Sequence, residues 1–183
     1  SYCSSRSLSY SEKRLNIPWS SAATHCTLAV CTLALSSRPN SSVSTRSNRR
    51  LKNTVTLENG YVVVGELEQE MSIDDFAVLV AETLDCHGLR YTDTDKMIRK
   101  VAVGGGACGD FMADAMRNSD CFVTSDLKYH EMLDAAEENF AVINAGHFET
   151  ENLPFLMLKE KLEKEFDEVE FMEAPVSNPI LEI

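Results

Sequence analysis

Two kinds of apolar pattern alternate along most of this chain, and they constrain its fold more than any other feature. Short β-branched runs of strand length alternate with stretches whose apolar residues recur every three or four positions. The strands are expected at residues 61–67, 89–92, 99–103, 121–124, 140–145 and 169–172. The helices are expected at residues 72–84, 110–117, 127–138 and 153–166. Strands that alternate with helices predict an α/β fold.

The first 50 residues differ in composition from the other 133. They contain 14 serines, no Gly and no Asp, and their net charge is +6, whereas the rest of the chain has a net charge of −18. Because α/β domains use Gly and Asp in turns and helix caps, we assign residues 1–53 to an atypical Ser/Arg-rich leader, disordered or non-native. Residues 54–183 are then the folded domain, and a chain beginning near Thr54 is expected to keep the fold.

Three special origins for this leader stay open, beside an ordinary disordered tail. Its Ser-rich, Arg-rich and acid-poor composition is that of an organelle transit peptide. The apolar run at residues 22–35, preceded by Lys13 and Arg14, faintly resembles a secretory signal. The stretch is also compatible with sequence that is not natural coding sequence, such as one read out of frame.

Composition also excludes several classes of protein. The net charge of −12 argues against nucleic-acid binding, since a phosphate backbone is held mainly by clustered Lys and Arg. No run of 18 apolar residues is present, so no membrane span is expected. The six cysteines form no C-x-x-C pair, which argues against a zinc ribbon and a thioredoxin-type motif. These features favour a cytoplasmic protein with reduced thiols.

Three loops follow predicted strands at the edge where α/β proteins bind ligands: residues 104–110, 125–130 and 146–151. The first matches G-x-G-x-x-G, the pattern of a dinucleotide site, with Asp126 as the acid that would bind a ribose. Asp110, however, places a carboxylate where a pyrophosphate needs the helix N-terminus. The glycines are therefore better explained by a tight turn that needs positive φ and close packing.

The other two loops carry histidines near carboxylates. His130 and Asp134 lie one helical turn apart, either as an ordinary surface pair or as an acid–base pair. His147 follows a predicted buried strand and Glu151 comes four residues later, so the two could converge on one metal ion. The spacing H-x-x-x-E is common, and most instances bind nothing.

Longer motifs add a resemblance to a known family. The segments at 124–130, 133–135, 143–151 and 158–162 closely resemble the carboxyl-terminal half of the Nif-three-like family. These are dinuclear-metal-centre proteins, often labelled type 2 GTP cyclohydrolase homologues. Residues 64–67 and 101–106 are similar to the family's upstream motifs, and the similarity runs from about Gly60 to Pro179. Ser125 stands where the family usually has Gly.

The resemblance implies a layered α/β/α domain with a mixed sheet, which is one half of a duplicated protein. In that family the two halves enclose a pair of divalent metal ions, here Zn, Mn or Fe, within a ring-shaped homo-oligomer. The G-H-x-x-x-E motif places metal ligands at His147 and Glu151. The first-half ligands, a His-His pair and the Asp of H-T-x-L-D, are absent, and the nearest echo is His25-Cys26-Thr27-Leu28-Ala29.

Two functions follow as alternatives. The resemblance implies a metal-dependent hydrolase acting on a nucleotide-like substrate, with His130 as a catalytic proton carrier and a metal site that is incomplete in this chain. The missing first-half ligands favour instead a regulatory or interaction protein in which the metal is structural or absent. For either function we expect self-association into a homo-oligomer, and no membrane or nucleic-acid partner.

Overall fold

The computed structural model describes residues 51–180, except for the side chains of residues 153–157, 160 and 161. One six-stranded sheet forms the centre of this part of the chain. Its strands are β1 (Lys52–Thr56), β2 (Val63–Met71), β3 (Arg90–Tyr91), β4 (Ile98–Val103), β5 (Cys121–Thr124) and β6 (Ala141–Asn144), in the spatial order β1-β2-β4-β5-β6-β3. The β4-β5-β6 pairs are parallel and the outer pairs antiparallel, so the sheet is mixed.

Helices cover both faces of the sheet. They are α2 (Ile73–Leu84), the short 3-10 helix η1 (Gly109–Phe111), α3 (Met112–Asn118), α4 (Tyr129–Glu137) and α5 (His147–Glu165). On one face the apolar side of α2, including Phe76 and Val80, packs on the sheet. On the other face Ala115 of α3 and Ala135 of α4 pack against Phe122 and Val142. The predicted layered α/β/α domain is therefore confirmed.

Helix α2 illustrates how closely local sequence specifies an element. Ser72 precedes it, and the Ser72 hydroxyl accepts a hydrogen bond from the Asp75 amide, as a side-chain N-cap does. Its buried residues recur at helical spacing and end at Leu84. The chain then leaves the helix through Asp85, whose φ of 57° is left-handed. The helix predicted at residues 72–84 is thus confirmed almost to the residue.

Two predicted elements differ from the structure, and one observed strand was not predicted. Helix α5 begins at His147 rather than near residue 153, so it runs through Pro154 instead of starting beside it. The strand expected at residues 169–172 is wrong, because that segment pairs with no described strand and Met172 is 85% exposed. Strand β1 was not expected. The predicted boundary between residues 53 and 54 falls inside it, and predictions about residues 1–50 lie outside the described residues.

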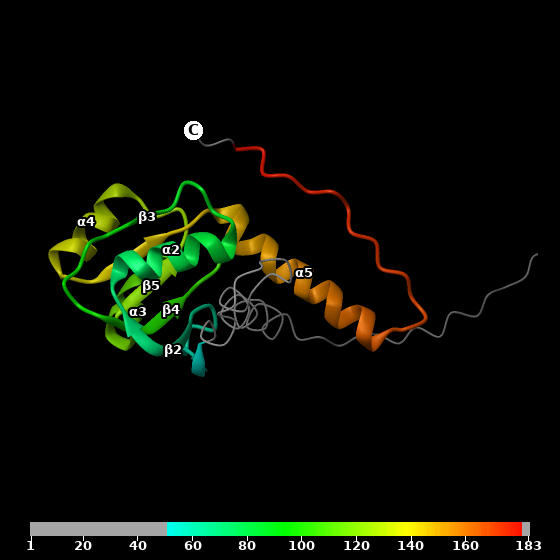
Figure 1. Ribbon diagram of the computed structural model, residues 1–183, viewed down its shortest axis with the longest axis horizontal. Helices are drawn as coiled ribbons and strands as arrows, with labels where there is room; N and C mark the ends of the chain where they lie inside the picture. Colours follow the sequence, from blue (N-terminus) through cyan, green and yellow to red (C-terminus); the bar gives the residue numbers. More distant parts are fainter. Residues whose placement is uncertain (1–50, 181–183) are drawn as a thin grey trace, which may run out of the picture.

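Helix α5 extends away from the sheet, and the chain after it runs back toward the N-terminal end of the same helix (Figure 1). Lys159 of α5 lies 3.8 Å from the carboxylate of Glu173 in the returning segment. Near the start of α5 the Asn178 amide donates to Glu149 Oε1 at 3.0 Å. Within residues 51–180, none of the helices has the length and apolar character that a membrane crossing requires.

Candidate metal centre

The three loops singled out in the sequence meet at one edge of the sheet. They follow β4, β5 and β6, which are parallel neighbours and therefore end on the same side. The glycines at 104–106 follow β4, Ser125 and Asp126 follow β5, and α5 begins two residues after β6. The fold thus brings together residues that are more than 40 positions apart in the chain.

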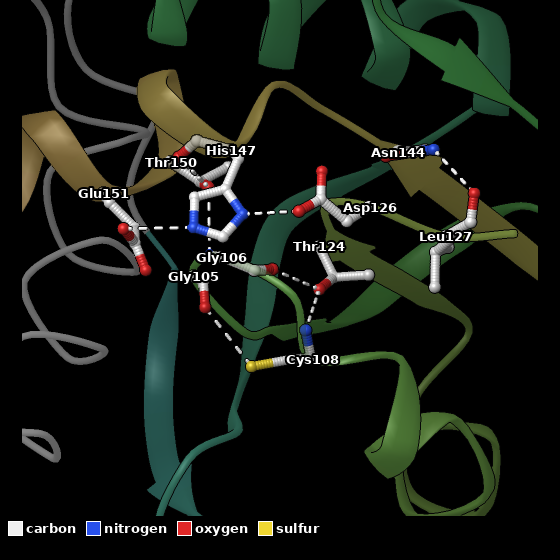
Figure 2. A network of polar contacts seen from close by, with 10 residues as sticks. All are labelled: Gly105, Gly106, Cys108, Thr124, Asp126, Leu127, Asn144, His147, Thr150 and Glu151. Carbon is white, nitrogen blue, oxygen red and sulfur yellow. Dashed lines mark hydrogen bonds and ion pairs between the residues drawn. The ribbon is translucent and has the colours of Figure 1, made fainter.

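His147 and Glu151 lie one turn apart at the start of α5, and their side chains face each other (Figure 2). His147 Nε2 is 3.2 Å from Glu151 Oε2. The two side chains are neighbours, and their role as metal ligands stays a prediction. The geometry differs from the expected one, in which His147 left the end of the strand. Both residues belong to the helix, since Gly146 is the extended N-cap residue and helical geometry starts directly after it. The four-residue spacing therefore places them on one helical face.

A second carboxylate contacts the other nitrogen of the ring. Asp126 Oδ2 lies 2.6 Å from His147 Nδ1. Both contacts stabilise the charged ring relative to the neutral one, so the pKa of His147 is raised from its ordinary value. The hydrogen bond to Asp126 is the largest cause, and the charge of Glu151 adds to it, while desolvation acts in the opposite direction. The ring thus lies between two negative charges.

The distance between His147 and Glu151 suits a shared divalent cation. Imidazole nitrogen and carboxylate oxygen each bind Zn²⁺ at about 2.0–2.2 Å, which places two adjacent ligand atoms about 3.0–3.5 Å apart. The observed 3.2 Å lies within that range. Asp126 cannot be a third ligand to the same ion, because it lies at the opposite ring nitrogen. In the described part of the chain, no three His, Cys, Asp or Glu side chains converge on one possible metal position.

The glycine loop forms the base of this site. Gly106 has a φ of +67°, and a Cβ at this position would collide with Glu151 Oε1 and lie 3.4 Å from His147 Nε2. A Cβ at Gly104 would lie 2.7 Å from the Cβ of Cys108. The interpretation as a tight turn is therefore confirmed. Asp126, the acid that a dinucleotide site would have used, contacts His147 instead.

Two buried threonines hold the Gly106 peptide from opposite sides. Thr124 of β5 donates to the Gly106 carbonyl and accepts from the Cys108 amide. Thr150 of α5 accepts from the Gly106 amide and donates to the His147 carbonyl. Both threonines are at most 1% exposed. Water cannot reach these polar groups, so their hydrogen bonds must come from within the protein. We call Thr124, Thr150 and the Gly106 peptide the threonine clamp.

The nearby cysteine is a thiol rather than a thiolate. Burial raises the pKa of Cys108, and the charges of Glu151 and Asp110 raise it further. Cys108 Sγ donates to the Gly105 carbonyl at 3.3 Å, which uses the thiol proton. Among the described residues, Cys108 and Cys121 are buried free thiols. Cys108 therefore supports the glycine turn through its thiol proton.

A cavity of about 530 Å³ opens beside the imidazole. Its polar side carries Asp126, His147 and Glu151. The returning segment forms the other side with apolar residues, chiefly Val176, Pro179 and Ile180, while Phe148, Asn152 and Asn178 complete the lining. The site thus combines acidic groups and one imidazole with an apolar wall.

His130 lies apart from this constellation. It is on the first turn of α4, its side chain is exposed, and it is not among the residues that line the cavity. Among the described residues, no side chain makes a hydrogen bond or ion pair with the His130 ring, Asp134 included. Its role as a proton carrier stays a prediction.

Sequence reasoning missed three contributors to the site, namely Asp126 as the partner of His147, Gly106 as the base under Glu151, and Thr150 as a clamp. A signal existed for Asp126. A carboxylate directly after a buried strand, at the same sheet edge as His147, is placed to reach it. Thr150 carries no comparable signal, because its partner is a backbone amide 44 positions away.

Comparison with known proteins identifies relatives for most of the chain. The family model described as Duf34/NIF3 (NGG1p interacting factor 3) matches residues 11–179. A Clostridium acetobutylicum protein named GTP cyclohydrolase 1 type 2 homolog is 39% identical over 125 residues, which are 67% of this chain and 45% of that protein. A Clostridium perfringens protein of the same name is 32% identical over 124 residues, or 66% of this chain and 47% of the relative.

A solved structure supports the same relationship. The crystal structure of a Bacillus cereus protein related to NIF3 superposes with a TM-score of 0.61 at 27% identity, covering 67% of this chain and 36% of that one. The chain thus spans about half the length, or less, of the relatives that it matches.

Proposed function

The chain belongs to the Duf34/NIF3 family, and we propose that it functions as a metal-dependent hydrolase in which His147 and Glu151 hold a divalent cation. The observation that carries this proposal is the 3.2 Å separation of His147 Nε2 and Glu151 Oε2, with the ring anchored at its other nitrogen by Asp126. A divalent cation bound here would take the position between His147 Nε2 and Glu151 Oε2, in competition with a proton on Nε2.

The family relationship and the cavity support a hydrolytic role. A cation bound by one imidazole and one carboxylate would retain bound water, and it would lower the pKa of that water and polarise the attacked group. The chain's own residues would then orient the substrate. The apolar wall formed by Val176, Pro179 and Ile180 suits a planar ring, such as the base of a nucleotide, with its polar end toward His147. His130 is the proposed proton carrier.

A regulatory or interaction role is the second candidate. It is favoured by the ligand set, because two protein ligands are fewer than the three or four that a transition metal normally takes from a protein. No further convergent ligand is present in residues 51–180. Under this alternative the metal is structural or absent. Metal-stimulated hydrolysis of GTP or a related nucleotide would favour the first candidate, and retained metal without hydrolysis would favour the second.

Metal analysis after dialysis tests the proposed ligands. We expect weak, exchangeable binding of Zn²⁺ or Mn²⁺ by the full chain, and further loss of affinity in His147→Ala and Glu151→Gln. His87→Ala is the matched control, since His87 is an exposed histidine outside the cavity. Binding unchanged by His147→Ala would refute the ligand assignment. Two tightly retained ions per chain would refute an incomplete site.

We also propose self-association. Exposed apolar side chains gather on the distal part of α5 and the segment that follows it: Leu158, Val169, Met172, Val176 and Ile180 are 47–85% exposed. Large exposed apolar side chains can contribute to an interface with another copy of the chain. Light scattering is expected to show a particle larger than one chain at micromolar concentration, and a strict monomer would contradict the proposal.

A further inference from the structure

Asp126 has a left-handed backbone conformation. Its φ of 55° is left-handed, although it is neither Gly nor the C-cap of a helix. The residues beside it are fixed by burial, with Ser125 fully buried and Leu127 4% exposed. Asp126, in contrast, lies at the surface, and its side chain is 54% exposed. The backbone thus turns between two buried residues and presents the Asp126 carboxylate to the sheet edge.

The Asp126 carboxylate is directed at one atom of the site. Figure 2 shows it approaching the His147 ring from the side opposite Glu151, with Oδ2 2.6 Å from Nδ1. An ionised carboxylate has no proton to donate, so Nδ1 carries the proton and donates it in this contact. In the neutral ring Nε2 then carries the lone pair. That lone pair faces Glu151 and the cavity.

We propose that Asp126 is a positioning residue that holds His147 in the Nδ1–H tautomer and aims Nε2 at the cation shared with Glu151. Hydrogen bonding of the distal nitrogen to a carboxylate fixes the orientation of a ligating imidazole and raises its basicity. The tautomer part of this inference rests on geometry alone. The part about the cation rests on the proposed function.

A purely structural role for the contact is disfavoured by its exposure. The side chains of His147 and Asp126 are 44% and 54% exposed, and exposed ion pairs contribute little to stability. The threonine clamp holds the loops together independently of Asp126. Removal of the Asp126 carboxylate should therefore change the imidazole more than the fold.

Two substitutions distinguish the effect of the Asp126 side chain from the effect of its backbone conformation. Asp126→Gly removes the carboxylate and adopts φ 55° without strain, so the melting temperature should be unchanged or raised. Asp126→Asn tolerates the same φ and keeps an oxygen acceptor for Nδ1–H, but loses the charge. Asp85→Gly is the matched control, because Asp85 has a φ of 57° at the end of α2 and does not line the cavity.

Nitrogen NMR of the His147 ring in metal-free protein reads the tautomer directly, at a pH where the ring is neutral. We expect the Nδ1–H form in the wild type, in Asp85→Gly and in Asp126→Asn. In Asp126→Gly we expect a shift toward the Nε2–H form that prevails in free histidine. An unchanged tautomer in Asp126→Gly would overturn the inference, whatever the protein does with metal.

Competition with a chromogenic chelator for Zn²⁺ tests the second part. Asp126→Gly should weaken Zn²⁺ binding by about 10- to 100-fold, as loss of such a partner does elsewhere, and Asp126→Asn should weaken it less. If His147→Ala weakens binding and Asp126→Gly does not, the inference fails while the proposed function stands. If neither variant changes binding, the metal proposal itself fails, and the tautomer result still decides the role of Asp126.

Discussion

At the scale of single residues, the charge on His147 links this site to pH. Its pKa is raised above the ordinary value of 6.5, chiefly by the hydrogen bond to Asp126. A group with a raised folded pKa stabilises the fold fully below its unfolded pKa, and this contribution is lost as pH rises through the folded pKa. The metal-free protein should therefore lose stability as pH rises above about 6.5.

Urea unfolding of the wild type and of His147→Gln across this pH range measures the effect. The difference between the two curves should decline with rising pH, and it should be small because the side chain is 44% exposed. The affinity for Zn²⁺ should instead rise with pH, because protons compete with the cation for Nε2. A difference curve that rises with pH would show that the imidazolium is not the favoured form.

The second prediction at this scale concerns Gly106. Gly106→Ala introduces positive-φ strain of about 1–2 kcal/mol and a Cβ that collides with Glu151 Oε1. Gly60→Ala is the control, because Gly60 has a φ of +76° and its added Cβ would meet nothing within 4 Å. Both variants should lose stability by chemical denaturation, but only Gly106→Ala should also weaken Zn²⁺ binding in the chelator assay. Equal metal affinities would show that Gly106 has no role at the site.

At the scale of elements, the threonine clamp joins the turn after β4 to β5 and α5. Thr150→Val leaves the Gly106 amide without its acceptor. Thr124→Val removes two hydrogen bonds of the hydroxyl, while the Cys108 amide and the Gly106 carbonyl keep backbone partners. Each variant should lower the free energy of unfolding by about 1–3 kcal/mol, with the larger loss in Thr150→Val, and their effects should not be additive because both act on the backbone of Gly106.

Thr83→Val is the control for the clamp. Its hydroxyl donates to the Leu79 carbonyl within helix α2, and its removal leaves no buried amide without an acceptor. We expect a change within about 0.5 kcal/mol for this variant in the same urea titration. Losses as small for Thr124→Val and Thr150→Val as for Thr83→Val would contradict the clamp.

At the scale of the whole molecule, the extent of the folding unit can be tested by truncation. Leu51 is 6% exposed and packs against Gly65, and β1 begins at the next residue. A chain that starts at Leu51 should keep the thermal transition of the full chain. A chain that starts at Thr54 should lose about 2–3 kcal/mol, chiefly from the exposure of core surface that Leu51 covers.

Circular dichroism and urea unfolding of the two truncated chains provide the measurement. An unfolded chain starting at Leu51 would mean that residues 11–50, which the family match includes, contribute to the fold. Equal stability of both truncated chains would place the boundary at Thr54, as composition suggested.

Local sequence determined most of the elements and the pair of ligand candidates. Helix α2 and strand β5 follow from a capping serine, helical spacing and a β-branched run, which are properties of neighbouring residues. His147 and Glu151 share a face because they are four residues apart on a helix. The first residue of that helix was harder to predict from the sequence. Pro154 favours a helix that starts beside it, whereas α5 starts at His147 and continues past Pro154.

Contacts across the sheet edge were decided by the tertiary structure alone. Asp126 meets His147 across 21 positions, and Gly106 meets Thr150 across 44. Such contacts depend on β4, β5 and β6 being parallel neighbours, and strand order is a property of packing rather than of any local pattern. The sequence by itself therefore determined the fold class and two candidate ligands, while the partner of His147 and the base beneath Glu151 exist only because the sheet brings distant loops to one edge.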